Sequence, residues 1–144
     1  MPAELPRLIA LGRELKAAVE AEHEVVHPVE PELRDIYGVI FWQAEGDRPL
    51  TQRKVTVFAD GEVDRSPCGS GTSARLALLD ARGELSRGAP LRHLSIVGTE
   101  FEARVVDAVE GGVVTEISGT AHRTGTHEFT LDPADELGTG FLLR

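Results

Sequence analysis

One predicted helix, residues 71–82, constrains the fold more than any other stretch of this sequence. Its apolar residues do not form a single stripe but cover most of its circumference: Ala74, Leu76, Ala77, Leu78, Leu79 and Ala81. A helix that is apolar on nearly all sides is packed inside a protein. Gly83 follows at the position where glycine commonly caps a helix. We therefore expect other elements to surround this helix.

The segments on either side of it are mostly strands. Apolar and alternating patterns predict strands at 35–43, 53–59, 94–98, 101–109, 113–118 and 126–132, with a hairpin turn at 110–112. The first of these, "DIYGVIFWQ", is apolar without alternation, so we expect it to be buried on both faces. Residues 4–21 have the pattern of an amphipathic helix. These patterns predict one α+β domain over residues 1–144, with a mostly β body around one buried helix.

Composition excludes several classes of function. The chain has 144 residues, a size that can bury one ordinary core. It has no apolar run near the ~20 residues that a membrane helix needs, and we expect no membrane partner. Its net charge is -9, and only two lysines are present, so a basic surface for nucleic acid is not expected. A single cysteine fits a reducing compartment, and we expect a cytoplasmic protein.

That cysteine, Cys68, stands at the start of the predicted helix in "DRSPCGSGTSARLALL". The N–H groups of a first helical turn have no partner inside the helix, and together with the helix dipole they favour a nearby negative charge. A thiol there forms a thiolate more readily, and Gly69 and Gly71 let an anion approach the backbone. A lone cysteine is also often buried filler, and Asp64 is equally suited to a turn or a cap. The spacing alone leaves both interpretations open.

The same stretch resembles the second cysteine motif of the proline racemase family, which includes 4-hydroxyproline epimerases and trans-3-hydroxy-L-proline dehydratases. The resemblance extends to "HPVEPELRDIYGVIF", "LSIVGTEFEARV" and "EISGTAHRTGTHEFTLDPADELGTGFLL". It implies a fold similar to one half of diaminopimelate epimerase, a mostly antiparallel β half-barrel around a central helix. It also implies racemisation or epimerisation at Cα of proline or 4-hydroxyproline, with no cofactor and no metal.

His122 and His127 are five residues apart in strand-like sequence, so they would point to opposite faces and make no metal pair.

By this resemblance, two cysteines act on opposite faces of the substrate Cα, one as a thiolate base and one as a thiol acid. Cys68 would be one of them. Asp64 would accept hydrogen bonds from the ring ammonium, and the N–H groups of Gly69 and Ser70 would hold the carboxylate. Phe58 matches an aromatic residue beside the pyrrolidine ring.

The sequence departs from the family at one decisive point, because it has one cysteine and no counterpart of the family's first, Met-Cys-Gly-His-like motif. It resembles the C-terminal half alone. Four interpretations follow: an inactive fragment or truncated product, a homodimer that pairs two Cys68 residues, a separate chain that supplies the N-terminal half, or a dehydratase in which Cys68 acts as the only base. Family dehydratases often have threonine at this position, which disfavours the last. A non-enzymatic interaction module is the alternative outside catalysis.

Overall fold

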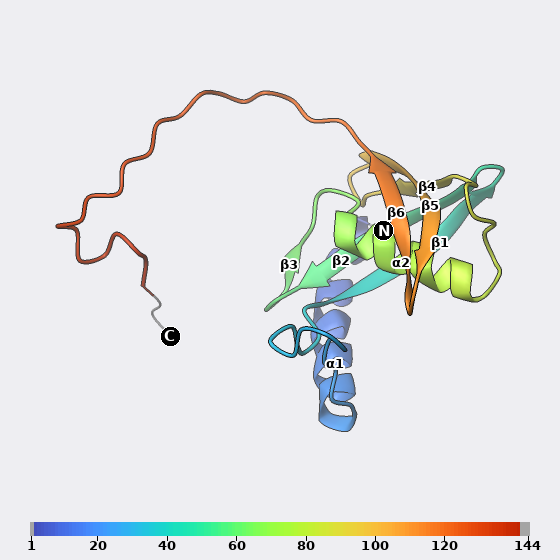
Figure 1. Ribbon diagram of the computed structural model, residues 1–144, viewed down its shortest axis with the longest axis horizontal. Helices are drawn as coiled ribbons and strands as arrows, with labels where there is room; N and C mark the ends of the chain where they lie inside the picture. The colour runs from blue at the N-terminus through green and yellow to red at the C-terminus, as the bar shows by residue number, and fades with distance from the viewer. Residues whose placement is uncertain (1, 142–144) are drawn as a thin grey trace.

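A six-stranded sheet forms the body of the protein in the computed structural model, which describes residues 2–141 (Figure 1). The strands are β1 (Gly38–Asp47), β2 (Leu50–Phe58), β3 (Glu62–Val63), β4 (Leu91–Leu94), β5 (Glu100–Val109) and β6 (Gly112–Ser118). The helices are η1 (Pro2–Glu4), α1 (Leu5–Glu22) and α2 (Gly69–Ala81). The strand order is β1-β2-β4-β5-β6, β3 pairs with β2, and β2 and β4 are parallel while the other pairs are antiparallel. The expectation of an α+β fold is confirmed.

Helix α2 lies across one face of this sheet (Figure 1). Its buried side contributes Leu76 and Leu79 to an apolar core. The rest of that core comes from β4 and β5: Leu91, Ala103 and Val105. The opposite side of the helix is open, and Leu78 is 40% exposed. The expectation of a helix covered on all sides is wrong for this chain, because the sheet covers only one of its faces.

Strand β1 is not buried on both faces, which corrects a second expectation. It lies at an edge of the sheet, and its residues are half-buried or exposed. The buried strand is its neighbour β2, in which residues 54–57 are all buried. Side chains alternate along β2, and Val57 faces α1. There it packs against Gly12: a Cβ added to Gly12 would lie 3.1 Å from the Cβ of Val57. Lys54 and Thr56 face the side of α2.

The sequence placed two further strands wrongly. The strand expected at 94–98 lies earlier in the chain, as β4 at Leu91–Leu94. Residues 95–99 form the turn that leads into β5. The strand expected at 126–132 does not form. Residues 119–141 run away from the sheet without regular structure, and Phe129 is 90% exposed (Figure 1). An alternating segment becomes a strand only beside a neighbour that satisfies its N–H and C=O groups. Residues 142 and 143, the last two of the stretch "EISGTAHRTGTHEFTLDPADELGTGFLL", lie outside the described residues.

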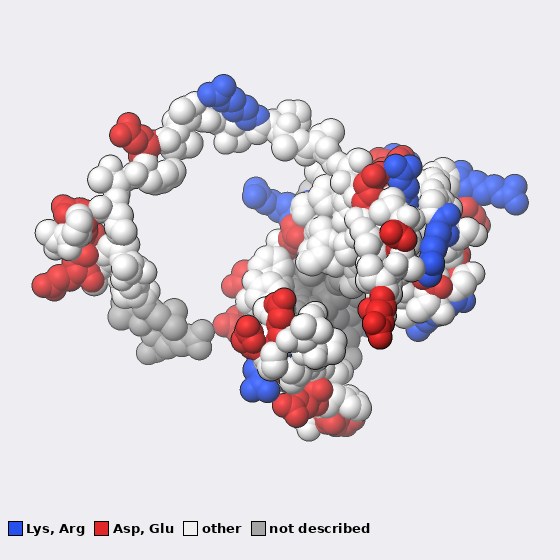
Figure 2. All heavy atoms as spheres, in the orientation of Figure 1, with Lys and Arg blue, Asp and Glu red and all other residues white. Residues whose placement is uncertain are grey.

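The surface mixes both signs of charge. On the face drawn in Figure 2, acidic and basic side chains are interspersed over the body. None of the helices within residues 2–141 is long and apolar enough to cross a membrane.

Candidate active site

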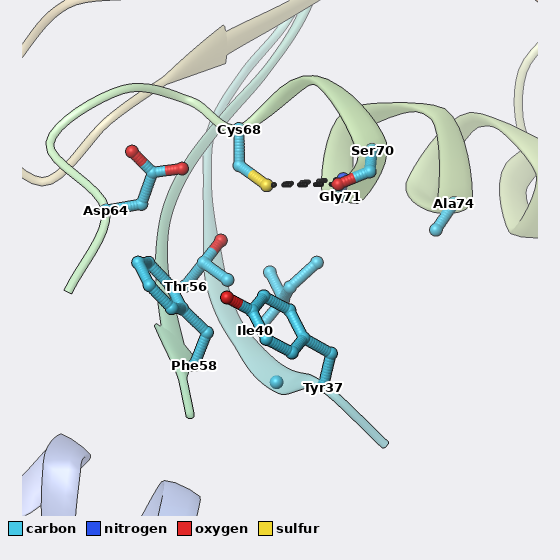
Figure 3. A pocket seen from close by; sticks show the side chains of 10 residues that line it. Tyr37, Ile40, Thr56, Phe58, Asp64, Cys68, Ser70, Gly71 and Ala74 are labelled. Atoms are coloured by element: carbon cyan, nitrogen blue, oxygen red, sulfur yellow. Dashed lines mark hydrogen bonds between the residues drawn. The ribbon is translucent and has the colours of Figure 1, made fainter. Parts of the chain in front are cut away.

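A cavity of about 430 Å³ lies between the sheet and the first turn of α2. Strands β1 and β2 form one wall, and the loop after β3 with the start of α2 forms the other (Figure 3). It is lined by Tyr37, Gly38, Ile40, Thr56, Phe58, Asp64, Cys68, Ser70, Gly71 and Ala74. The cavity is open to solvent. It is therefore a place where a small ligand can reach both the helix start and the sheet.

Cys68 is the N-cap of α2 and has an unusual backbone, with φ 59° and ψ 114°. Residues other than glycine seldom adopt a positive φ, and such strain costs about 1–3 kcal/mol and is concentrated at functional sites. This conformation turns the half-buried sulfur toward the first helical turn (Figure 3). There Sγ accepts a hydrogen bond from the Gly71 N–H at 3.4 Å and lies 3.6 Å from Ser70 Oγ. The thiol is thus held beside the N–H groups of the helix terminus.

Asp64 fixes the loop that carries the cysteine. Its Oδ1 accepts hydrogen bonds from the Ser66 backbone N–H at 2.9 Å and the Ser66 hydroxyl at 3.0 Å. Ser66 Oγ in turn accepts the Cys68 N–H at 2.9 Å. Asp64 is therefore a turn residue, as one interpretation of the sequence had it, and it also lines the cavity.

A buried hydroxyl and imidazole anchor the helix start from below. Thr72 Oγ1 donates its only hydrogen to the Pro67 carbonyl at 3.1 Å, so His93 Nδ1, at 3.0 Å, must carry a hydrogen and donate it to Thr72. His93 is 0% exposed, and its other nitrogen, Nε2, has no hydrogen-bond partner within residues 2–141. Burial, and then the charges of Lys54 and Arg75, lower the pKa of His93 to about 3. The imidazole is therefore neutral at ordinary pH.

Two cations are buried in the same layer. Lys54 is 1% and Arg75 is 8% exposed. Arg75 donates to Gln52 Oε1 at 2.9 Å and its guanidinium lies 4.0 Å from the ring centre of Trp42. Burial lowers the pKa of both Lys54 and Arg75, against the opposing effect of nearby negative groups. The interior beneath the cavity is consequently rich in positive charge.

The structure brings four of the five expected site residues to one cavity: Phe58, Asp64, Cys68 and Ser70. The fifth, Gly69, is the first residue of α2 but does not line the cavity. Sequence reasoning missed Tyr37, which stacks on Phe58 with the ring centres 5.7 Å apart. It also missed Lys54. Alternate side chains of a strand point to the same face, so Lys54 and Phe58, four residues apart, lie on one face of β2.

No group of three or more His, Cys, Asp or Glu side chains is placed to bind a metal ion in the part of the chain that the structure describes.

The family model described as proline racemase matches residues 1–142. The chain belongs to the proline racemase family. Two relatives are named as enzymes that act on hydroxyprolines: the chain is 47% identical over 136 residues to a trans-3-hydroxy-L-proline dehydratase of Bacillus cereus, and 47% identical over 142 residues to a 3-hydroxyproline 2-epimerase of Burkholderia multivorans. These alignments cover 92% and 96% of this chain.

A solved structure agrees with this membership of the proline racemase family. A hydroxyproline epimerase from Agrobacterium vitis, crystallised with trans-4-hydroxy-L-proline, superposes with a TM-score of 0.82 over 99% of this chain at 36% identity. The chain spans only 41% and 42% of the two relatives and 42% of that solved chain. It therefore corresponds to less than half of a proline racemase family enzyme.

Proposed function

We propose that this cavity is one side of an acid/base site, at which Cys68 moves the Cα proton of proline or 4-hydroxyproline and so racemises or epimerises that carbon without a cofactor. The observation that carries the proposal is the position of Cys68. Its sulfur lies in a cavity of amino-acid size and accepts a hydrogen bond from the Gly71 N–H at a helix terminus, and Asp64 lines the same cavity. A thiolate base needs such an electropositive, partly open environment.

The lining residues suit the groups of a cyclic amino acid. The helix N-terminus favours the substrate carboxylate, which the N–H groups of Gly69 and Ser70 would hold. Asp64 would accept hydrogen bonds from the ring ammonium. Phe58 and the stacked Tyr37 would pack against the apolar ring carbons.

The chemistry needs both parts of this arrangement. The Cα–H of an amino acid is a very weak acid, so the barrier falls only if a placed base acts while the developing negative charge on the carboxylate is stabilised. In the forward step the Cα–H bond breaks, its proton moves to the Cys68 sulfur, and the electron pair delocalises into the carboxylate. Inversion then requires a second acid that delivers a proton to the opposite face of Cα.

That second group has to come from outside the described residues, because Cys68 is the chain's only cysteine. A homodimer that pairs two cavities, or a separate chain that corresponds to the N-terminal half, would supply it. The open side of α2 and Tyr37, which is 73% exposed, are surfaces that such a partner would cover.

We also propose that the fold is the half-barrel type of diaminopimelate epimerase. We propose further that the enzyme works in amino-acid metabolism in the reducing cytoplasm.

A second function, the dehydration of trans-3-hydroxy-L-proline, is favoured by the name of the Bacillus cereus relative. It begins with the same step. The Cα–H bond breaks and its proton goes to Cys68, the Cα–C3 double bond forms, and the C3–O bond breaks to release the hydroxyl, which leaves as water with a proton from solvent or an acid. A single base is enough for this elimination.

The test is Cα proton–deuterium exchange of three substrates in D₂O, followed by NMR: L-proline, trans-4-hydroxy-L-proline and trans-3-hydroxy-L-proline. Exchange with inversion, at a rate per chain that rises with protein concentration, supports a dimeric site with two cysteines. Exchange without inversion supports a half-site with one base, and loss of water from the 3-hydroxy substrate alone supports the dehydratase. No exchange at any protein concentration would contradict catalysis by this chain alone and would leave an inactive half-domain or interaction module.

A further inference from the structure

A buried lysine lies beneath the cavity, in the middle of β2. Lys54 is 1% exposed, and its Nζ donates a hydrogen bond to Thr56 Oγ1 at 3.3 Å. None of the salt bridges formed within residues 2–141 includes it. A buried ammonium is costly unless an opposite charge compensates it. The position of Lys54 therefore calls for a negative partner nearby.

The sulfur of Cys68 faces this ammonium across a small gap. A Cβ on Gly71 would lie 2.7 Å from Lys54 Nζ and 3.2 Å from Cys68 Sγ. The two atoms thus border one space that is kept open because residue 71 has no side chain. Burial lowers the pKa of Lys54 from its usual 10.5, and negative charge on Cys68, followed by that of Asp64, opposes this effect.

The other charged and titratable groups around the gap do not supply a better counter-charge. Arg75, from α2, is a second buried cation, and His93, from β4, is neutral with a pKa of about 3. Asp64, from the loop after β3, also favours the charge of Lys54, but less than Cys68 does, and its Oδ1 accepts two hydrogen bonds from Ser66. Two cations and a neutral imidazole leave the interior short of negative charge, and a thiolate at Cys68 would supply it.

We propose that Lys54 is a positioning residue whose buried ammonium holds Cys68 as a thiolate from beneath the cavity. The proposal rests on the role of Cys68 given under Proposed function and adds to it, because it assigns Cys68 the part of the base in the unliganded protein. When the substrate Cα–H bond breaks, the proton goes to the sulfur, and Lys54 keeps its own proton throughout. Cys68 then deprotonates the substrate enantiomer that presents its Cα–H toward the sulfur.

The first experiment is a pH titration of thiolate absorbance near 240 nm. Ionised tyrosine also absorbs there, so the contribution of Tyr37, the chain's single tyrosine, is subtracted with Tyr37→Phe, and the remaining signal reports Cys68, the chain's only cysteine. Wild type is compared with Lys54→Met, which keeps the length of the side chain and removes its charge. The matched control is Lys16→Met at the chain's only other lysine, which is half-buried on α1. We expect the midpoint of Lys54→Met to rise by about one pH unit or more, which leaves about tenfold less thiolate at pH values below both midpoints and slows alkylation by iodoacetamide there in proportion. Lys16→Met should titrate as wild type, and equal midpoints in all three proteins would overturn the proposal.

A second measurement covers the case in which Lys54→Met does not fold. Charge coupling is reciprocal, so removing the thiolate must change the titration of Lys54. With ¹³Cε-labelled lysine the protein gives two side-chain NMR signals, and we expect that of Lys54 to titrate at a lower pH in Cys68→Ser than in wild type. An unchanged Lys54 titration in Cys68→Ser would refute the pairing. Neither measurement uses a substrate, so a coupled pair without Cα exchange would sustain this proposal and contradict the proposed function.

Discussion

Lowering the pH from 7 to 5 should destabilise this protein through His93. In the folded chain His93 stays neutral down to a pKa of about 3, because it is buried and lies near the charges of Lys54 and Arg75. In the unfolded chain an ordinary histidine takes up a proton near pH 6.5. The unfolded state therefore binds more protons than the folded state between these values, and stability falls as the pH falls.

The magnitude follows from the two pKa values. Between pH 7 and pH 5 the unfolded imidazole becomes almost fully protonated while the folded one does not, which lowers the free energy of unfolding by about 2 kcal/mol. This figure requires only that the folded pKa of His93 lies well below 5. The loss continues toward pH 3, where it reaches about 4 kcal/mol, although carboxylates also contribute there.

The assay is urea unfolding of wild type and His93→Asn at pH 7, 6 and 5. The asparagine amide can donate to Thr72 in place of Nδ1–H, and it does not titrate. We expect His93→Asn to be less stable than wild type at pH 7, and its fall in stability between pH 7 and pH 5 to be smaller than that of wild type by about 2 kcal/mol. An equal fall in the two proteins would show that His93 does not cause the loss of stability.

Two matched pairs on α2 test the packing around the site by the same urea unfolding. Gly71→Ala should cost about 1–3 kcal/mol, because its methyl would lie 2.7 Å from Lys54 Nζ, whereas Gly69→Ala has nothing within 4 Å and should be neutral or stabilising by up to about 1 kcal/mol. Comparable losses for the two glycines would contradict the close approach. Leu76→Ala should cost about 2–5 kcal/mol because Leu76 is 0% exposed, and Leu78→Ala, at 40% exposure, less than about 1 kcal/mol. Equal costs for the two leucines would show that the exposed side of α2 is covered in solution.

The apolar pattern of α2 predicted a helix but not what covers it. The sequence does not distinguish one leucine of α2 from another, yet the sheet buries Leu76 and leaves Leu78 exposed. The strand expected at 126–132 failed for a related reason, because alternation shows which residues can pair and not whether a neighbouring strand is present. In both cases the missing information is the identity of a partner surface, which a local pattern does not contain.

The candidate site was predicted better than the strands, because its residues follow one another near the helix start. Cys68, Ser70 and Asp64 lie within seven positions, so one turn brings them together. Lys54 was missed, since a lysine in a strand is usually solvent-exposed. The need for glycine at residue 71 is visible only from what surrounds it, namely the Lys54 ammonium and the Cys68 sulfur.

Deuterium exchange by wild type and Cys68→Ser tests whether Cys68 removes the Cα proton. Both proteins are first shown by circular dichroism to be folded, and then mixed with L-proline or a hydroxyproline in D₂O. We expect Cα exchange in wild type and a loss of about 10²-fold or more in Cys68→Ser, because a serine hydroxyl is not a base at neutral pH. Exchange that survives the substitution, or that is absent from wild type at every concentration, would contradict this role of Cys68.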